Sequence, residues 1–129
     1  HVLEPVLAAQ GACFVYDYPT SQAALARIVE QDGVAVGQRF ELYVNGVELA
    51  NGYCELTDAK EQRRRFEQDN KRRVSAGKQP QPLDEHLLAA LQHGLPSCSG
   101  VALGIDRLLM LAAGKSDIRE VLAFDWSRS

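Results

Sequence analysis

The chain contains 129 residues, of which 46% are hydrophobic and 24% are charged, and its formal net charge is -3. This balance is typical of a globular domain with one core, and the net charge argues against a protein that coats nucleic acid. Because no apolar run approaches the ~20 residues of a membrane-spanning helix and the start does not resemble a signal peptide, we expect no membrane partner and a cytoplasmic location.

The first half of the chain reads mainly as strands. Residues 14–19 form a β-rich stretch that a proline closes, and the alanine-rich residues 21–29 predict a short helix. Apolar and polar residues alternate over 39–44, and Asn45-Gly46 is a favoured two-residue hairpin turn. Residues 47–55 are therefore the expected returning strand.

A long charged helix is expected next. Asp58 followed by Glu61 three residues later is a capping pair, and strong helix formers continue to about Gly77. The few apolar positions, chiefly Phe66 and Val74, form a narrow stripe. Most of the surface of this helix should therefore be exposed to solvent or contact a polar partner.

Two further helices and a strand complete the prediction. After a proline-rich break, residues 84–93 predict a helix that ends at Gly94. Residues 100–103 read as a buried strand, and residues 104–113 as an apolar helix that ends at Gly114.

The cysteines and histidines suggest no chemistry. Cys13, Cys54 and Cys98 are odd in number and far apart, without a C-x-x-C pair, so neither a disulfide framework nor a zinc site is indicated. The three histidines show no metal-type spacing. Because the chain begins with histidine and not methionine, we expect a processed or truncated piece of a longer protein.

Two carboxylates meet on one face of the expected hairpin. With a two-residue turn, Tyr43 pairs with Glu48, and Glu41 lies diagonally across from Glu48. Such neighbours repel unless a cation lies between them, and Mg²⁺ favours carboxylate together with phosphate oxygens. The alternative is a solvated polar face, which these two residues by themselves favour.

The returning strand carries a second polar set. Asn51, Tyr53 and Glu55 alternate and would share one face, where an amide, an aromatic wall and a negative charge can hold an ammonium group. The odd spacing from Glu48 to Asn51 would put these two residues on opposite faces of an ideal strand. A bulge near Gly52 would reconcile them.

The stretch from Gly100 to Arg107 is a glycine and arginine motif. Its glycine spacing fits neither a dinucleotide-binding fingerprint nor a phosphate-binding P-loop. Arg107 would lie in the first turn of an apolar helix, where the helix dipole disfavours a cation unless an anion offsets it. A phosphate held by the arginine fork and a salt bridge to Asp106 or Asp117 explain this equally well.

Two stretches together resemble the catalytic domain of class II lysyl-tRNA synthetases. They are F-E-L-Y-V-N-G-V-E-L-A-N-G-Y-C-E-L-T-D and G-V-A-L-G-I-D-R-L, the second resembling motif 3 of that family. The resemblance runs from about Phe14 to the end of the chain. It implies an α+β fold that is part of the class II aminoacyl-tRNA synthetase antiparallel sheet flanked by helices.

The same resemblance implies the domain organisation. Residues 1–129 would be the C-terminal portion of a single catalytic domain that includes motif 3. Motifs 1 and 2, which in the family build the dimer interface and bring an arginine to the α-phosphate, are missing from this sequence. We therefore expect the isolated chain to be inactive and the full-length parent to form a homodimer.

The resemblance also implies roles for the polar sets. Glu41 and Glu48 would hold magnesium on ATP, and Arg107, beside Gly104, would bind the ATP phosphates. The implied amino-acid pocket contains five residues: Asn51, Tyr53, Glu55, Gly100 and Ala102.

Departures from the synthetases resemble the related ligases that modify elongation factor P. Ala102 stands where lysyl-tRNA synthetases usually have glycine, and an extra methyl typically costs ~1 to 3 kcal/mol, enough for roughly 10- to 200-fold discrimination. The segments R-F-E-Q-D-N-K-R-R, P-S-C-S-G-V-A-L-G-I-D-R and A-F-D-W-S-R-S also look like this ligase group, which lacks an anticodon-binding domain.

This resemblance implies ATP- and Mg²⁺-dependent activation of (R)-β-lysine and its transfer to a lysine of elongation factor P, without tRNA. A catalytic portion of a lysyl-tRNA synthetase is one alternative, and a noncatalytic binding module is another. The intact set of Glu41, Glu48, Glu55 and Arg107 argues against the module, because a binding surface would not require it.

The sequence leaves open what the cations of the charged helix contact. They would contact elongation factor P, or tRNA in the synthetase alternative, or remain solvated and pair with acidic residues on the same helix. These cations are Lys60, Arg63, Arg64, Arg65, Lys71, Arg72 and Arg73.

Overall fold

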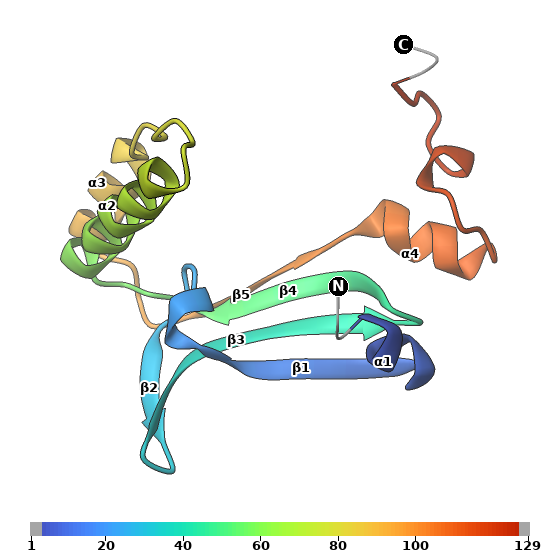
Figure 1. The fold of residues 1–129 in the computed structure, drawn as a ribbon, viewed down its shortest axis with the longest axis horizontal. Coiled ribbons are helices and arrows are strands. Elements are labelled where there is room, and N and C mark those ends of the chain that lie inside the picture. Colours follow the sequence, from blue (N-terminus) through green and yellow to red (C-terminus); the bar gives the residue numbers. More distant parts are fainter. Residues whose placement is uncertain (1–3, 127–129) are drawn as a thin grey trace. The chain divides into compact units, whose positions relative to one another are not determined.

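The computed structural model describes residues 4–126 and contains both helices and strands. The elements are α1 (Glu4–Ala9), β1 (Ala12–Pro19), the 3-10 helix η1 (Thr20–Gln22), β2 (Ile28–Gln31), β3 (Val34–Val44), β4 (Val47–Cys54), α2 (Ala59–Ser75), α3 (Glu85–His93), β5 (Ser99–Leu103), α4 (Ile105–Ala112) and the 3-10 helix η2 (Ile118–Glu120). The five strands form one sheet in the order β1-β3-β4-β5, with β2 paired to β3 (Figure 1). The α+β class is confirmed. No helix within residues 4–126 is long and apolar enough to cross a membrane.

The chain divides into two compact units, each discontinuous in sequence. The first unit comprises His1–Tyr16, Phe40–Gly52 and Val101–Ser129, and the second comprises Asp17–Arg39 and Tyr53–Gly100. Each is described by itself below. Within residues 4–126, the buried apolar residues are Leu49, Ala50 and Met110 in the first unit, and Ala23, Ala26, Leu88 and Leu91 in the second.

The β3–β4 hairpin turns where the sequence predicts. Asn45 and Gly46 have φ angles of 51° and 80°, the left-handed pair that a type I′ turn requires. The strand before the turn begins earlier than expected, because β2 and β3 form a second antiparallel hairpin with Ile28 paired to Gly37. Its turn is Asp32-Gly33, with φ angles of 50° and 77°.

The helix predicted over residues 21–29 is wrong. Only η1 is helical there. Ala24 has a φ of 50°, and Ala26 pairs with Glu55 in an isolated antiparallel bridge. The amide of Arg27 donates to the carbonyl of Cys54 at 2.8 Å. Alanine favours helix by only tenths of a kcal/mol per residue, so pairing with the end of β4 decides the conformation.

The long helix α2 begins and ends as predicted. The Asp58 carboxylate caps its first turn by accepting from the amides of Lys60 and Glu61 at 2.8 and 3.1 Å. Gly77, with a φ of 71°, follows its last turn. Glu61 does not act as the expected return arm of the capping pair, since its carboxylate bonds to arginines instead.

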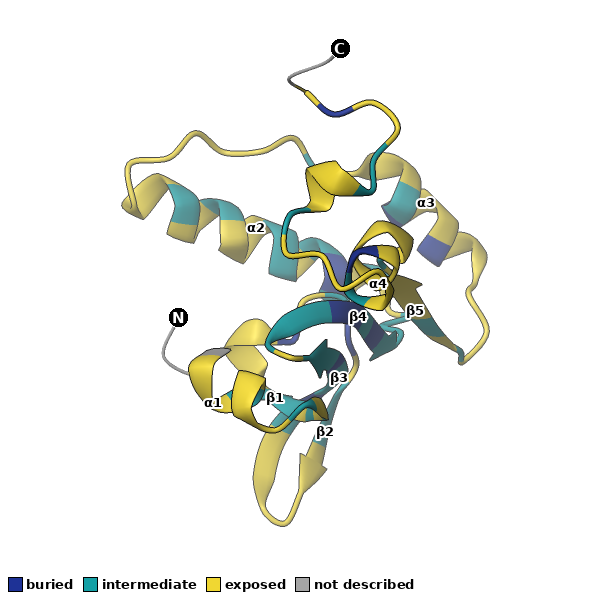
Figure 2. Cartoon of the chain, turned by 90° about the vertical axis from the view of Figure 1, so that its right-hand side faces the viewer, coloured by how far each residue is buried: buried dark blue, intermediate teal, exposed yellow. Residues whose placement is uncertain are grey.

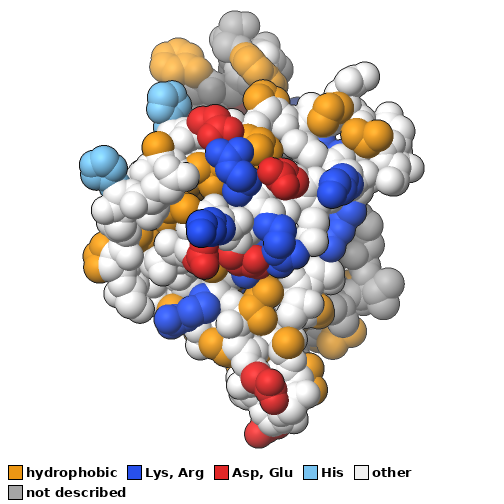
Figure 3. Space-filling model, turned by 90° about the vertical axis from the view of Figure 1, so that its left-hand side faces the viewer, with side chains coloured by type: hydrophobic (Ala, Val, Ile, Leu, Met, Phe, Trp, Pro, Cys, Tyr) orange, Lys and Arg blue, Asp and Glu red, His pale blue; other side chains and the backbone are white. Residues whose placement is uncertain are grey.

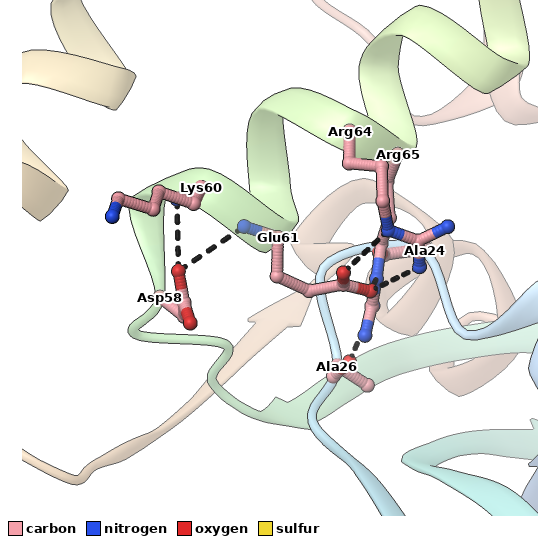
Figure 4. A network of polar contacts seen from close by, with 7 residues as sticks. All are labelled: Ala24, Ala26, Asp58, Lys60, Glu61, Arg64 and Arg65. Carbon is pink, nitrogen blue, oxygen red and sulfur yellow. Dashed lines mark hydrogen bonds and ion pairs between the residues drawn. The ribbon is translucent and has the colours of Figure 1, made fainter.

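These arginines connect α2 to the turn before β2. Arg64 and Arg65 donate to the two oxygens of Glu61, at 2.7 to 2.9 Å. Arg65 also donates to the carbonyls of Ala24 and Ala26, at 3.0 and 2.7 Å (Figure 4). The side chain of Arg65 is only 12% exposed, so this contact is a packed one rather than a loose surface pair.

The network makes stability depend on pH. The hydrogen bond from Arg64, supported by Arg65, lowers the pKa of Glu61 from its ordinary 4.5 to about 2. A carboxylate whose pKa is lower in the folded state stabilises the fold fully above its unfolded pKa and loses that contribution as pH falls. We expect the difference in unfolding free energy between wild type and Glu61→Gln to shrink between about pH 4.5 and pH 2, as measured by urea denaturation. A difference that stays constant over this range would contradict the prediction.

Helix α3 lies beside α2 in the second unit (Figure 1). Asp84 caps it by accepting from the amide of Leu87, and Gly94, with a φ of 108°, ends it as predicted. Arg63 on α2 and Glu85 on α3 form an ion pair at 2.6 Å. The α2–α3 pair is thus joined by an ion pair between side chains.

Strand β5 forms, but it is not the buried strand that was predicted. Val101 and Leu103 are 63% and 46% exposed, and β5 ends the strand order with β4 as its neighbour. Its apolar residues therefore find little cover within residues 4–126. Helix α4 follows and stops before Gly114, whose φ is 66°. Most of α4 is also exposed (Figure 2), with Met110 as its buried residue.

Candidate functional site

The hairpin carboxylates differ in their surroundings. Glu41 on β3 is only 7% exposed, and its Oε2 accepts a hydrogen bond from the Tyr43 hydroxyl at 2.6 Å. The side chain of Glu48 on β4 is 39% exposed. A buried, hydrogen-bonded carboxylate is not expected on a merely solvated face, so the solvated alternative does not describe Glu41.

Arg107 lies in the first turn of α4, as the sequence motif predicts, and its side chain reaches β4. Its Nη1 donates to the main-chain carbonyl of Glu48 at 2.8 Å and lies 3.9 Å from Glu48 Oε2. The alternative, a salt bridge to a nearby carboxylate, is met by Glu48 and not by Asp117, which pairs with Arg119. With 48% of its side chain exposed, Arg107 can present a guanidinium to a ligand while β4 holds it.

Gly104 holds the start of α4, the helix that carries Arg107, against β4. Its amide donates to the carbonyl of Leu49 at 2.8 Å, which joins the start of α4 to β4. A Cβ built on Gly104 would lie 3.5 Å from Cδ of Arg107 and 3.6 Å from the Leu49 carbonyl oxygen. These separations are ordinary van der Waals contacts, so a Cβ at position 104 would touch the Arg107 side chain and the strand without displacing either.

The first unit offers oxygen ligands of the kind that magnesium prefers. Mg²⁺ usually takes one or two carboxylates and completes its shell with water and substrate phosphates. Glu41 and Glu48 fit that chemistry in type and number. Among the residues that the structure describes, no group of three or more His, Cys, Asp or Glu side chains could hold a metal ion.

The second unit places Glu55 over β5. The Glu55 amide donates to the carbonyl of Cys98 at 3.0 Å, and its carboxylate lies over Gly100. A Cβ built on Gly100 would be 2.5 Å from Glu55 Oε1, closer than real Cβ contacts allow. Gly100 therefore provides the space that the Glu55 carboxylate occupies.

Tyr53 lies on the same side of the sheet as Arg39. The guanidinium carbon of Arg39 is 5.8 Å from the Tyr53 ring centroid. In an unbroken hairpin register, Arg39 would face position 52 and the Tyr53 ring would point away from it. The contact shows that the two side chains approach each other, and the bulge near Gly52 stays a prediction.

The remaining predicted pocket residues lie on the strands of the first unit. Asn51 is half-buried on β4, and Ala102 is exposed on β5. The sequence interpretation missed Arg39. No pattern in the sequence singles it out, because its contacts are with tyrosine rings on the two neighbouring strands.

The basic residues of α2 are largely paired. Figure 3 shows Lys and Arg side chains gathered on one face with acidic side chains among them. Arg63, Arg64 and Arg72 pair with Glu85, Glu61 and Asp69, respectively. This agrees with the interpretation of α2 as a solvated helix with local ion pairs. The three cysteines are all free thiols, as the sequence predicts.

Comparisons with known proteins match nearly the whole chain. The family model described as tRNA synthetases class II (D, K and N) matches residues 7–128. A curated relative from Edwardsiella ictaluri, named elongation factor P–(R)-β-lysine ligase, is 57% identical over 127 residues, which cover 98% of this chain and 39% of the relative.

Relatives of the same name give similar values. The relative from Sodalis glossinidius is 56% identical over 128 residues, which cover 99% of this chain and 39% of the relative. The relative from Proteus mirabilis is 57% identical over 122 residues, which cover 95% of this chain and 37% of the relative. The chain thus spans about two fifths of the length of the curated relatives that it matches.

Proposed function

Because the chain belongs to the class II tRNA synthetase (D, K and N) family, we propose that it carries the motif 3 portion of an ATP-dependent ligase that activates (R)-β-lysine and transfers it to a lysine of elongation factor P. The observation that carries this proposal is the identity of 52% to 57% with ligases of that name. The contact between Arg107 and Glu48 supports it, since it sets a guanidinium beside a carboxylate that could share a nucleotide.

The proposed reaction has two steps. A carboxylate oxygen of β-lysine attacks the α-phosphorus of ATP, the bond to the β-phosphate breaks, and pyrophosphate leaves. The ε-amine of the acceptor lysine then attacks the carbonyl carbon, an amide forms, and AMP and a proton are released. Both steps need orientation and charge neutralisation more than a covalent enzyme group.

Residues of the first unit would hold the nucleotide. Arg107 would bind phosphate oxygens by the planar donor pattern of its guanidinium. Glu41 and Glu48 would hold Mg²⁺, which when bound offsets negative charge on the phosphates. Tyr43 keeps Glu41 in place through its hydroxyl hydrogen bond, so this carboxylate needs little reordering when a cation arrives.

The amino acid would lie among residues of β4 and β5. Glu55 would pair with an ammonium group, Asn51 would donate or accept a hydrogen bond, and Tyr53 would wall the pocket. Gly100 leaves the space for the Glu55 carboxylate. The exposed methyl of Ala102 would add bulk at a position where lysyl-tRNA synthetases usually have glycine.

The first test is a chimera in which this chain replaces the matching 127 residues of the Edwardsiella ictaluri ligase. Pyrophosphate exchange dependent on (R)-β-lysine, followed by modification of elongation factor P, is the expected result. Preference for L-α-lysine would favour a lysyl-tRNA synthetase portion instead, and exchange with neither would favour a noncatalytic module. The unaltered ligase is the positive control, and the isolated chain is expected to give no exchange.

Ala102→Gly in the chimera should relax the choice of amino acid. Removing the methyl enlarges the pocket, and one methyl group is worth roughly 10- to 200-fold in discrimination. We expect the ratio of kcat/KM for β-lysine over α-lysine to fall by about tenfold or more, measured by pyrophosphate exchange with both amino acids. An unchanged ratio would remove Ala102 from the pocket. Ala112→Gly is a control on α4, where no role in the pocket is proposed.

Gly100→Ala should displace the Glu55 carboxylate. The added Cβ would lie 2.5 Å from Glu55 Oε1, so the flexible end of this side chain must move. Since a hydrogen bond to a charged group contributes ~1.5 to 3 kcal/mol, moving the carboxylate away from the ammonium group should raise the KM for the amino acid by about 10- to 150-fold. The KM for ATP should change little. Ser99→Ala, the preceding position on β5, should leave both constants unchanged, and a matching effect there would contradict the explanation.

The proposal also implies an oligomeric state, a location and a set of partners. We expect a homodimer, a cytoplasmic location, no membrane partner and no requirement for tRNA. Arg64 and Arg72 on α2 are candidate contacts for elongation factor P, and reversing their charge in the chimera should then lower modification of that factor.

A further inference from the structure

The geometry points to Arg39 as a positioning residue for the amino-acid pocket: we propose that it fixes the ring of Tyr53 against the sheet. This inference rests on the proposed function, because Tyr53 is the aromatic wall of that pocket. None of the motifs considered in the sequence includes Arg39, whose role comes from tertiary contacts alone.

Arg39 is held between two tyrosine rings of the second unit. Its guanidinium carbon lies 4.5 Å from the centroid of the Tyr18 ring and 5.8 Å from that of Tyr53. Both distances fall within the roughly 6 Å over which a cation is attracted to a ring face. The two rings come from β1 and β4, which are the neighbours of β3 on either side. Arg39 therefore bridges the three strands on one side of the sheet.

A main-chain contact fixes the guanidinium between these rings. Arg39 Nη1 donates to the carbonyl of Gln22, at the end of η1, at 2.9 Å. That carbonyl can approach because η1 and the residue after it pack tightly on β3. A Cβ built on Gly37 would lie 2.7 Å from Cβ of Ala23, a residue that is only 1% exposed. Glycine at position 37 thus allows the turn to reach the strand and present the carbonyl to Arg39.

The chemistry of arginine suits this place. A planar guanidinium can stack on aromatic faces while its edge donates to a carbonyl, whereas the ammonium of lysine is a compact, strongly hydrated charge without that flat face. Replacing Arg39 removes both the ring contact and the carbonyl contact. The Tyr53 ring then loses a fixed neighbour. The consequence should fall on binding of the amino acid and not on binding of ATP.

The test uses the active chimera with Arg39→Met and Arg39→Lys, and with Arg63→Met as a matched control. Arg63 belongs to the same unit, but its partner is Glu85 on α3. For Arg39→Met, we expect KM for (R)-β-lysine to rise by about 3- to 20-fold, a range set by typical cation–π energies. KM for ATP should stay within about twofold of the wild-type value, since no ATP contact changes. Arg39→Lys should give an intermediate rise, and Arg63→Met none.

A second measurement follows the ring itself. In the isolated chain, aromatic NMR resonances of Tyr53 and Tyr18 should shift in Arg39→Met and in Arg39→Lys but not in Arg63→Met. If Arg39→Met fails to fold, as judged by circular dichroism, Arg39→Lys alone decides the case. Unchanged amino-acid KM in a folded, active variant, or an equal rise in the KM values for ATP and amino acid, would overturn the inference. A wild-type chimera without activity would instead overturn the proposed function and the inference with it.

Discussion

Replacing Arg107 with alanine in the chimera is expected to lower the rate of β-lysine-dependent pyrophosphate exchange by about 100- to 1000-fold, the usual effect of removing one charge-stabilising donor. The guanidinium emerges from the first turn of α4, is held by the Glu48 carbonyl, and leaves about half of its surface exposed. Because it packs in no core, the thermal midpoint should change little. The rate of pyrophosphate exchange at saturating ATP and amino acid measures the effect.

Arg119→Ala is the matched control for this prediction. Arg119 is also an arginine of the first unit, and it pairs with Asp117 rather than with the hairpin. It should leave the exchange rate unchanged. Arg107→Lys should recover only part of the rate, since an ammonium cannot reproduce the planar donor pattern. If Arg107→Ala retained most of the activity, the assignment of Arg107 to the phosphates would fail.

Glu55→Gln is expected to lower kcat/KM for β-lysine by about 100-fold or more, because losing one member of a buried charge pair typically costs 2 to 5 kcal/mol. The substitution keeps the size of the side chain and removes its charge. The Glu55 amide hydrogen bond to Cys98 involves only the main chain and should survive. Pyrophosphate exchange at varied β-lysine concentration provides the measurement.

Glu30→Gln, on β2 of the same unit, is the control for a general loss of negative charge. Glu30 is exposed and forms no part of the proposed pocket. It should leave kcat/KM unchanged. An effect of Glu55→Gln confined to the KM for ATP would place Glu55 at the nucleotide instead of the amino acid.

Much of the local structure was predictable from neighbouring residues. Asn45-Gly46 determines a type I′ turn because both positions need a positive φ, and the carboxylates of Asp58 and Asp84 cap α2 and α3. These features depend on contacts within a few residues, which is why sequence patterns report them. The motif around Arg107 also predicted correctly that this residue lies in the first turn of a helix.

Where local preference and long-range pairing disagreed, the long-range pairing prevailed. Residues 21–29 are rich in alanine, yet Ala26 pairs with Glu55, and Arg65 donates to its carbonyl from 39 residues away. The predicted buried strand over residues 100–103 failed for a related reason. A run of apolar residues predicts a strand, but it does not predict which other segment will cover that strand. In the structure, β5 lies at the end of the strand order, with β4 as its neighbour.

The sequence by itself determined the family, the Asn45-Gly46 turn, the Asp58 cap of α2 and the residue types available for ATP and an ammonium group. Only the tertiary structure decided that Glu41 is buried under a tyrosine hydrogen bond, that Glu55 occupies the space over Gly100, and that Arg107 meets Glu48 across 59 residues of chain. It also revealed Arg39 between two rings. The physical reason is that burial, charge pairing and ring contacts depend on segments far apart in the chain, whereas propensity and capping act within a single turn.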